Sequence, residues 1–160
     1  MRHVELWLVL ASTIALWAAG GCGSLGAAAA AGEPTGPREP PYGLGVYNAT
    51  AAPLTEVAVT RTLEGGRVRV ETHGVVSPGR SSSNHFVPGA IPARATLSWR
   101  TPDGARHERE VAVAERVPDP ARFEGTVWFR VGPGGEVTVV PISDAERDAR
   151  AARQQPITPD

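Results

Sequence analysis

One cysteine carries the most distinctive chemistry in this chain. Cys22 is the only cysteine among 160 residues, and its thiolate is a nucleophile that can be acylated or oxidised. It follows the small residues Ala19, Gly20 and Gly21, which themselves follow an apolar run over residues 6–18. A lone thiol in a secreted protein needs a chemical reason, and acylation of the sulfur is such a reason because it also prevents stray oxidation.

The segment before Cys22 has the build of a secretory signal. Arg2 and His3 give a weak basic start, and small residues follow the apolar run. The run is shorter than the roughly 20 residues of a membrane-spanning helix. We expect a lipoprotein peptidase to remove residues 1–21 and to leave a palmitate-bearing Cys22 at the mature N-terminus. Cleavage by an ordinary signal peptidase within 27–31, where A-x-A spacing recurs, is the alternative.

The residue after the cysteine bears on the destination of the protein. Gly23 stands there rather than aspartate, and in this the chain resembles lipoproteins that Gram-negative bacteria sort to the outer membrane. The resemblance implies an exported protein that is held by lipid at Cys22 and faces the periplasm. Each buried CH₂ of an acyl chain contributes about 0.8 kcal/mol, so more than one chain gives stable anchoring.

Composition excludes several kinds of chemistry. Sixteen basic and 17 acidic residues nearly balance, so charge gives no argument for nucleic acid as a partner. Every basic residue is arginine, which excludes a lysine Schiff base and a P-loop. The histidines, His3, His73, His85 and His107, have no metal-like spacing. The sequence therefore predicts neither a cofactor nor a metal site.

The chain divides into four parts. Residues 1–21 are the expected signal peptide. Residues 22–41 are rich in Gly, Ala and Pro, which predicts a disordered tether. Residues 42–142 carry the apolar pattern of a folded domain. Residues 143–160 are polar, and the Ser143–Glu146 spacing is that of a capping box, so we expect a short exposed helix or a tail.

Residues 42–142 have the pattern of short strands separated by Gly and Pro turns. In 95–100 apolar and polar residues alternate, the turn residues 101–104 follow, and the chain returns over 105–114, which predicts a hairpin. A second hairpin joins 125–131 to 136–141 through a Gly-rich turn. Weaker strand signals lie at Leu44–Thr50, Leu54–Thr62, Arg67–Thr72, Val75–Val76 and His85–Val87.

Seven or eight such strands, with turn signals every 8–12 residues, are typical of an all-β protein. The predicted fold is an antiparallel β-sandwich, Ig-like or transthyretin-like, and a small barrel is the alternative. Four aromatic residues are the expected centre of the core: Phe86, Trp99, Phe123 and Phe129. Trp128 is expected on the opposite face of its strand.

The loop Gly79–His85 is the most polar segment next to apolar strand. A hydrolase would take a serine from Ser81–His85, His85 as the base, and Asp103 or Asp119 as the acid. Geometry rather than composition makes such a triad. A triple serine beside glycine is far more often a flexible turn, so the sequence favours a recognition loop here and predicts no catalytic residue.

Five residues are the candidates for contact with a partner. Arg80, Asn84 and His85 belong to the polar loop, whereas Arg100 and Arg106 flank the turn of the first hairpin. Arginine is enriched in interface hot spots. The alternative for the hairpin arginines is a solvated face whose charges protect an edge strand.

The stretch Ile91–Arg100, followed by Pro102, Asp103 and Gly104, resembles phrases in small uncharacterised bacterial lipoproteins. Some of these resemble immunity lipoproteins that neutralise toxins delivered by contact-dependent secretion systems. The resemblance implies a cell-envelope protein that binds another protein. The hypotheses are thus a non-catalytic protein-binding module, an immunity or inhibitor protein as a special case of it, and a hydrolase that uses Ser81–His85.

Overall fold

The computed structural model describes residues 41–157 and 159 of the chain. Contacts divide the chain into two units, 1–36 and 37–160, and the described residues all belong to the second. The predicted signal peptide, Cys22 and the tether up to residue 40 lie outside the described residues. Within the described part of the chain, no helix has the length and apolar character needed to cross a membrane.

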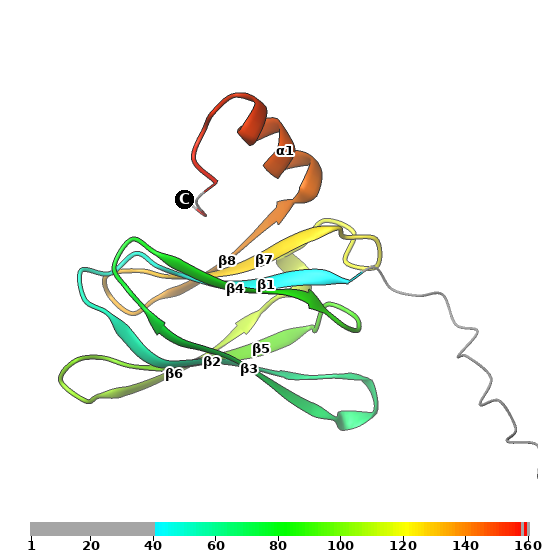
Figure 1. Cartoon of the computed structure of the whole chain (residues 1–160). Helices are drawn as coiled ribbons and strands as arrows, with labels where there is room; N and C mark the ends of the chain where they lie inside the picture. The colour runs from blue at the N-terminus through cyan, green and yellow to red at the C-terminus, as the bar shows by residue number, and fades with distance from the viewer. Residues whose placement is uncertain (1–40, 158, 160) are drawn as a thin grey trace, which may run out of the picture. The chain divides into compact units, whose positions relative to one another are not determined.

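Two four-stranded sheets stack face to face as the layers of a sandwich (Figure 1). The first sheet has the order β4-β1-β7-β8, with β1 Tyr42–Asn48, β4 Ser81–Val87, β7 Gly125–Val131 and β8 Val137–Ser143. The second has the order β3-β2-β5-β6, with β2 Leu54–Thr62, β3 Val68–Val76, β5 Arg94–Arg100 and β6 Arg106–Ala112. The described residues also form three short helices: η1 Glu64–Gly66, η2 Ala114–Arg116 and α1 Asp144–Ala152. The predicted all-β sandwich is confirmed.

All neighbouring strands but one pair are antiparallel. The exception is β1 with β7, which run parallel, with Gly43 opposite Thr126 and Asn48 opposite Val131. A parallel pair requires a crossover connection rather than a tight turn, and the five intervening strands, β2 to β6, supply it. Nothing in either strand alone indicates this partner, so the sequence predicted only the antiparallel pairs.

Both predicted hairpins are confirmed. In the β5–β6 hairpin Arg100 lies opposite Arg106, and the Gly104 N–H donates to the Thr101 carbonyl at 2.8 Å. The β7–β8 turn is closed by the Gly135 N–H, which donates to the Gly132 carbonyl at 2.9 Å. Gly104 and Gly135 have φ of 83° and 75°, a conformation that glycine adopts without strain.

The core lies between the two sheets and is mostly aliphatic. Of the four aromatic residues expected there, Trp99, Phe123 and Phe129 are buried. His107, opposite Trp99 in the hairpin, stacks on its ring with centroids 5.2 Å apart. The prediction for Phe86 was wrong, because its side chain is 79% exposed and its φ is 62°, which turns it away from the core.

Trp128 takes the outer face of the first sheet, as expected, and covers the sheet itself. Gly45 of β1 lies opposite it, and a Cβ at Gly45 would clash with the indole ring. The glycine therefore leaves the space that the tryptophan ring occupies beside the neighbouring strand.

Two upstream segments differ from the prediction. Val75–Val76 is the end of β3 rather than a separate strand, because β3 continues through Gly74, whose φ is 65°. The segment expected to be a polar loop is β4 from Ser81 onward. Pairing with β1, which places Ser82 opposite Val46 and Asn84 opposite Leu44, outweighs the weak strand propensity of the serines.

The helix after the domain begins where the capping-box spacing predicts. Ser143 is the N-cap, and its hydroxyl accepts the Glu146 N–H at 3.1 Å. Of the residues in α1, none is buried. Its surface carries the ion pairs Arg147–Asp144 at 2.9 Å and Arg150–Glu146 at 2.6 Å, which stabilise an exposed helix by a few tenths of a kcal/mol each.

Candidate functional site

One side of the sandwich is formed by β3, β4 and the turn between them, and we call residues 67–87 the β3–β4 edge. β3 pairs only with β2, and β4 pairs only with β1. The chain passes from one layer to the other through the turn at 77–80 (Figure 1). Each strand thus has one side of its backbone without a strand partner.

The two layers are joined along this edge by a histidine. Nδ1 of His73 on β3 lies 3.3 Å from the hydroxyl oxygen of Ser82 on β4. His73 is only 8% exposed, and its Nε2 has no hydrogen-bond partner among the described residues. Burial lowers the pKa of His73 below 6.5, and the Glu71 carboxylate and hydrogen bonding to Ser82 oppose that effect in part.

A buried ion pair lies further along the same edge. Arg61 of β2 is 1% exposed, and its Nη2 lies 3.2 Å from Oε1 of Glu71 on β3. Its Nη1 donates to the carbonyl of Pro88 at 3.2 Å, and its guanidinium carbon lies 5.9 Å from the ring centroid of Tyr42. Arg61 therefore joins the beginning of β3, the end of β4 and β1 inside the sandwich.

The outward side of the edge is apolar. Val68, Val70 and Val75 of β3 are 62%, 55% and 64% exposed, and Phe86 of β4 is 79% exposed. Of the large apolar side chains that are exposed in the described residues, only Ile157 lies elsewhere. Solvent-facing apolar groups gathered on two adjacent edge strands are unusual, because natural proteins protect such edges with charge, proline or bulges.

The charges along this edge are almost all positive. Arg67, Arg69 and Arg80 are exposed and form no ion pair with the described residues. The one acidic residue in 67–87 is Glu71, whose carboxylate is paired with Arg61. The edge thus presents apolar side chains beside cations that have no partner.

The structure brings three of the five predicted interaction residues to this edge. Arg80 is exposed in the turn, and His85 is exposed on β4. Asn84 is only partly exposed, because it lies opposite the core residue Leu44. The prediction that these residues lie together is consistent with the geometry, although they lie at a strand edge and not on a flexible loop.

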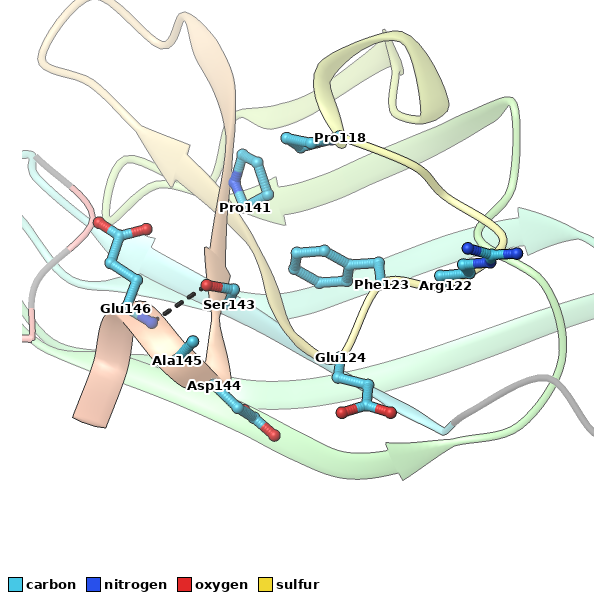
Figure 2. A pocket seen from close by; sticks show the side chains of 9 residues that line it. All are labelled: Pro118, Arg122, Phe123, Glu124, Pro141, Ser143, Asp144, Ala145 and Glu146. Atoms are coloured by element: carbon cyan, nitrogen blue, oxygen red, sulfur yellow. Dashed lines mark hydrogen bonds between the residues drawn. The ribbon is translucent and has the colours of Figure 1, made fainter. Parts of the chain in front are cut away.

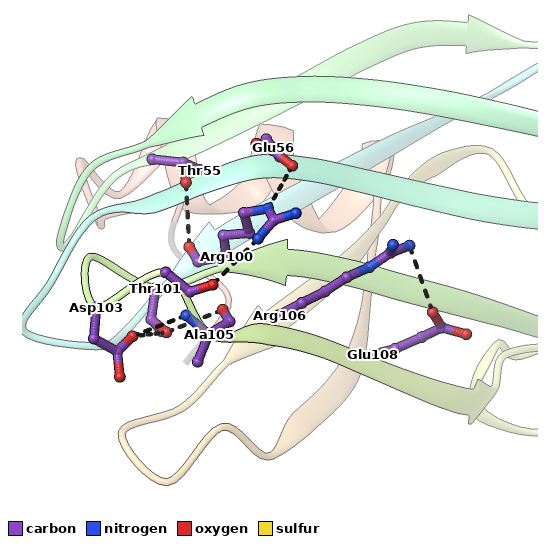
Figure 3. A network of polar contacts seen from close by, with 9 residues as sticks. Thr55, Glu56, Arg100, Thr101, Asp103, Ala105, Arg106 and Glu108 are labelled. Carbon is purple, nitrogen blue, oxygen red and sulfur yellow. Dashed lines mark hydrogen bonds and ion pairs between the residues drawn. The ribbon is translucent and has the colours of Figure 1, made fainter.

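Arg100 and Arg106 lie on a different surface, the β5–β6 hairpin (Figure 3). Nε of Arg100 lies 2.8 Å from Oε2 of Glu56, and its Nη1 donates to the Gly104 carbonyl at 3.2 Å. Arg106 has Glu108 at 3.9 Å. These arginines are paired within the protein, so the geometry favours the solvated, charge-protected face over a partner site for them.

Asp103 belongs to the turn of that hairpin. Its carboxylate accepts the Thr101 hydroxyl at 2.6 Å and the Ala105 N–H at 3.2 Å. These hydrogen bonds lower the pKa of Asp103, and the bond from Thr101 has the largest effect. The carboxylate is therefore used to close its own turn. The hydrolase hypothesis required Asp103 to orient His85, and Asp103 does not do so.

Two serine–histidine contacts exist at the edge. Ser83 Oγ and His85 Nε2 are 3.4 Å apart on the exposed face of one strand, and Ser82 meets His73 through Nδ1. A serine hydrolase needs a base whose second ring nitrogen is oriented by an acid. No described carboxylate is hydrogen-bonded to either histidine, so neither contact has the arrangement of a triad.

A cavity of 390 Å³ lies where α1 begins (Figure 2). Phe123, Pro118 and Pro141 form its apolar wall, and Glu124 and Arg122 stand at its rim. A second cavity, of 340 Å³, is lined by residues 62–64, Arg67 and 89–93. The candidate residues predicted from the sequence line neither of them. The described residues contain no group of three or more His, Cys, Asp or Glu side chains placed to hold a metal ion.

Sequence reasoning did not single out Arg61 or His73. A signal for Arg61 exists, because Val57, Val59 and Arg61 alternate along one face of β2, and that face is the buried one. The burial of His73 is harder to predict from the sequence, because the bulge near Gly74 breaks the alternation of inward and outward side chains along β3.

His73 makes the stability of the protein sensitive to pH. Well above pH 6.5 the ring is neutral in the folded and unfolded states. Below 6.5 the unfolded chain takes up the proton first, because the folded pKa is lowered, so the free energy of unfolding falls as pH falls toward the folded pKa. We expect denaturant titrations from pH 8 to 5 to show a steeper loss for the wild type than for His73→Asn.

The matched control for this prediction is His85→Gln, which removes an exposed histidine from the neighbouring strand. Its pH profile is expected to follow that of the wild type. Equal slopes for the wild type and His73→Asn between pH 6.5 and 5 would contradict the assignment.

Comparison with known proteins does not indicate a function. No family model matches the sequence, and no curated protein matches it. The NMR structure of a protein from Eubacterium rectale is 12% identical with a TM-score of 0.41, and the match covers 64% of this chain and 89% of that one. The function is therefore argued from the geometry of the described residues.

Proposed function

We propose that this is a lipid-anchored cell-envelope protein whose β-sandwich binds another protein without catalysing a reaction. Cys22 is the proposed site of acylation, and the Gly-, Ala- and Pro-rich residues 22–41 are the proposed tether. The partner is proposed to be an envelope protein that contacts the β3–β4 edge.

The observation that carries this proposal is the exposure of Val68, Val70, Val75 and Phe86 on two adjacent edge strands. Burying a large apolar side chain releases roughly 1.5–3 kcal/mol relative to leaving it in water. A sandwich that keeps four of them exposed on two adjacent edge strands forgoes that stabilisation unless a partner covers them. Aromatic and arginine side chains are also enriched in binding hot spots, and Phe86 and Arg80 are both exposed here.

Photo-crosslinking at Phe86 tests the proposal. Phe86 is replaced by benzoylphenylalanine in the full chain, and cells that produce it are irradiated. We expect adducts of defined mass at position 86, because the side chain is exposed on β4 at the proposed interface. The matched control carries the same group at Thr138, an exposed position on β8, and should give none. Absence of adducts at 86, or the same adducts at both positions, would contradict the proposal.

The anchor is tested in the same cells. Cys22→Ser removes the thiol that acylation requires, and we expect the variant to leave the membrane fraction for the soluble one. The wild type should remain with the membranes, with a mature mass that includes the acyl groups. Equal sedimentation of the two proteins would contradict the lipid anchor while leaving the interface proposal standing.

An immunity or inhibitor protein is the same proposal with a secreted toxin as the partner, and the identity of the crosslinked protein distinguishes the two. A hydrolase is the less favoured candidate, because an exposed Ser83–His85 contact of 3.4 Å is not oriented by a carboxylate.

A further inference from the structure

We propose that β3 receives an extended segment of the partner as an additional strand, and that this segment alternates apolar and acidic residues. The inference rests on the proposed function, since it names the mode and chemistry of the contact at the β3–β4 edge. It follows from three properties of β3: its free backbone side, the order of its side chains and the sign of its charges.

Among the edge strands, β3 offers a regular segment over residues 68–73 with exposed valines, and the bulge near Gly74, whose φ is 65°, ends that segment. The sandwich has four edge strands, β3, β4, β6 and β8. β8 contains Pro141, which has no N–H to donate, and it runs directly into α1. β4 is interrupted at Phe86, whose φ of 62° departs from strand geometry. β6 is covered by alternating charges, Arg106, Glu108, Arg109 and Glu110.

β3 is nine residues long, and its side chains are sorted by face. Val68 and Val70 lie opposite Thr62 and Thr60, on the outer face of the second sheet. Arg69 lies opposite Arg61, on the other face. Because successive side chains alternate between faces, a strand added beside β3 meets Val68 and Val70 on one face. On the other face it meets Arg69 of β3 and Arg67 just before the strand, and further along Glu71, which is paired with Arg61. The complementary segment therefore alternates apolar residues with Asp or Glu.

Charge argues against a second copy of this chain as the occupant. In an antiparallel pair with β3 of another copy centred on Val68, Arg67 and Arg69 would lie opposite each other, and like charges placed opposite each other are destabilising. Glu71 cannot compensate, since it is held by Arg61. An acidic strand from a different protein satisfies both arginines, and main-chain hydrogen bonds to β3 supply affinity that does not depend on sequence.

A peptide selection on the full-length protein tests the inference. Short random peptides displayed on phage are selected for binding, and the selected peptides are synthesised. We expect sequences in which apolar residues alternate with Asp or Glu. In hydrogen exchange the bound peptide should slow exchange of the amides of β3, while the amides of β6, the opposite edge of the same sheet, are unchanged. Selection of no peptide, of basic peptides, or of peptides that leave β3 exchange unchanged would overturn the inference.

Charge reversal provides the second arm of the test. Arg67→Glu combined with Arg69→Glu should weaken binding of the selected acidic peptides by about tenfold or more, since two favourable cross-strand pairs become repulsive. The matched control is Arg116→Glu, an exposed arginine of η2 that also forms no ion pair with the described residues. Equal weakening by both changes would mean attraction to net charge only and would overturn the inference.

The two proposals fail separately. If crosslinks form at Phe86 but the peptides do not protect β3, the protein-binding function stands and strand addition is wrong. If neither crosslinks nor selected peptides are found, both proposals fail.

Discussion

Replacing Phe129 by alanine is expected to lower the free energy of unfolding by about 3–5 kcal/mol, whereas Phe86→Ala is expected to change it by less than about 0.5 kcal/mol. Phe129 is 0% exposed between the two sheets, and truncating it leaves a cavity that close-packed neighbours fill only in part. Phe86 is 79% exposed, so its ring contributes little to the folded state. Urea titration of both variants at one pH measures the two free energies.

The pair of variants also separates stability from binding. Phe86→Ala is expected to fold like the wild type and to lose the partner, whereas any loss of partner in Phe129→Ala is accompanied by unfolding. A stability loss above about 2 kcal/mol for Phe86→Ala would mean that its ring is buried, and the proposed interface would then lose its aromatic residue.

These two phenylalanines show how far strand alternation predicts the core. Phe129 stands between Val127 and Val131 in a clear two-residue period, and all three side chains are buried. Phe86 stands beside Val87, and only one of two adjacent residues in a strand can face the core. The structure buries Val87 and turns Phe86 outward with a φ of 62°. Composition favoured the larger side chain, but pairing with β1 determines the face.

Local signals predicted the hairpins, and long-range pairing determined the rest. The turns at 101–104 and 132–135 carry their own chemistry, so β5–β6 and β7–β8 follow from the sequence. The polar segment Ser81–His85 becomes a strand because β1 pairs with it, and β1 reaches β7 in parallel. Such contacts join residues far apart in the chain, and no local pattern specifies them.

The sequence predicted where the candidate site lies, but it did not predict which buried polar residues the site contains. The sequence pointed to Arg80, Asn84 and His85 because polar residues beside apolar strands mark recognition segments. The polar groups inside the edge were not predicted, since they depend on which face of β3 meets β4. His73 is buried where the edge strands β3 and β4 meet, and Arg61 is buried on the inner face of β2 beside Tyr42.

The buried ion pair is the second change for which we expect a large effect. Glu71→Ala leaves the guanidinium of Arg61, which is 0% exposed, without its carboxylate, and should lower the free energy of unfolding by about 3 kcal/mol. Arg61→Met removes the charge together with its desolvation cost and keeps an unbranched side chain beside Tyr42. The double variant is therefore expected to be more stable than Glu71→Ala alone. Urea titrations of the four proteins give the coupling free energy.

An exposed pair supplies the control for that cycle. Arg100 and Glu56 lie 2.8 Å apart with side chains 41% and 69% exposed, and solvent-exposed pairs contribute about 0–1 kcal/mol. The same cycle with Arg100→Met and Glu56→Ala should give a coupling several times smaller. Equal couplings would mean that water reaches Arg61, so that the β3–β4 edge opens in solution.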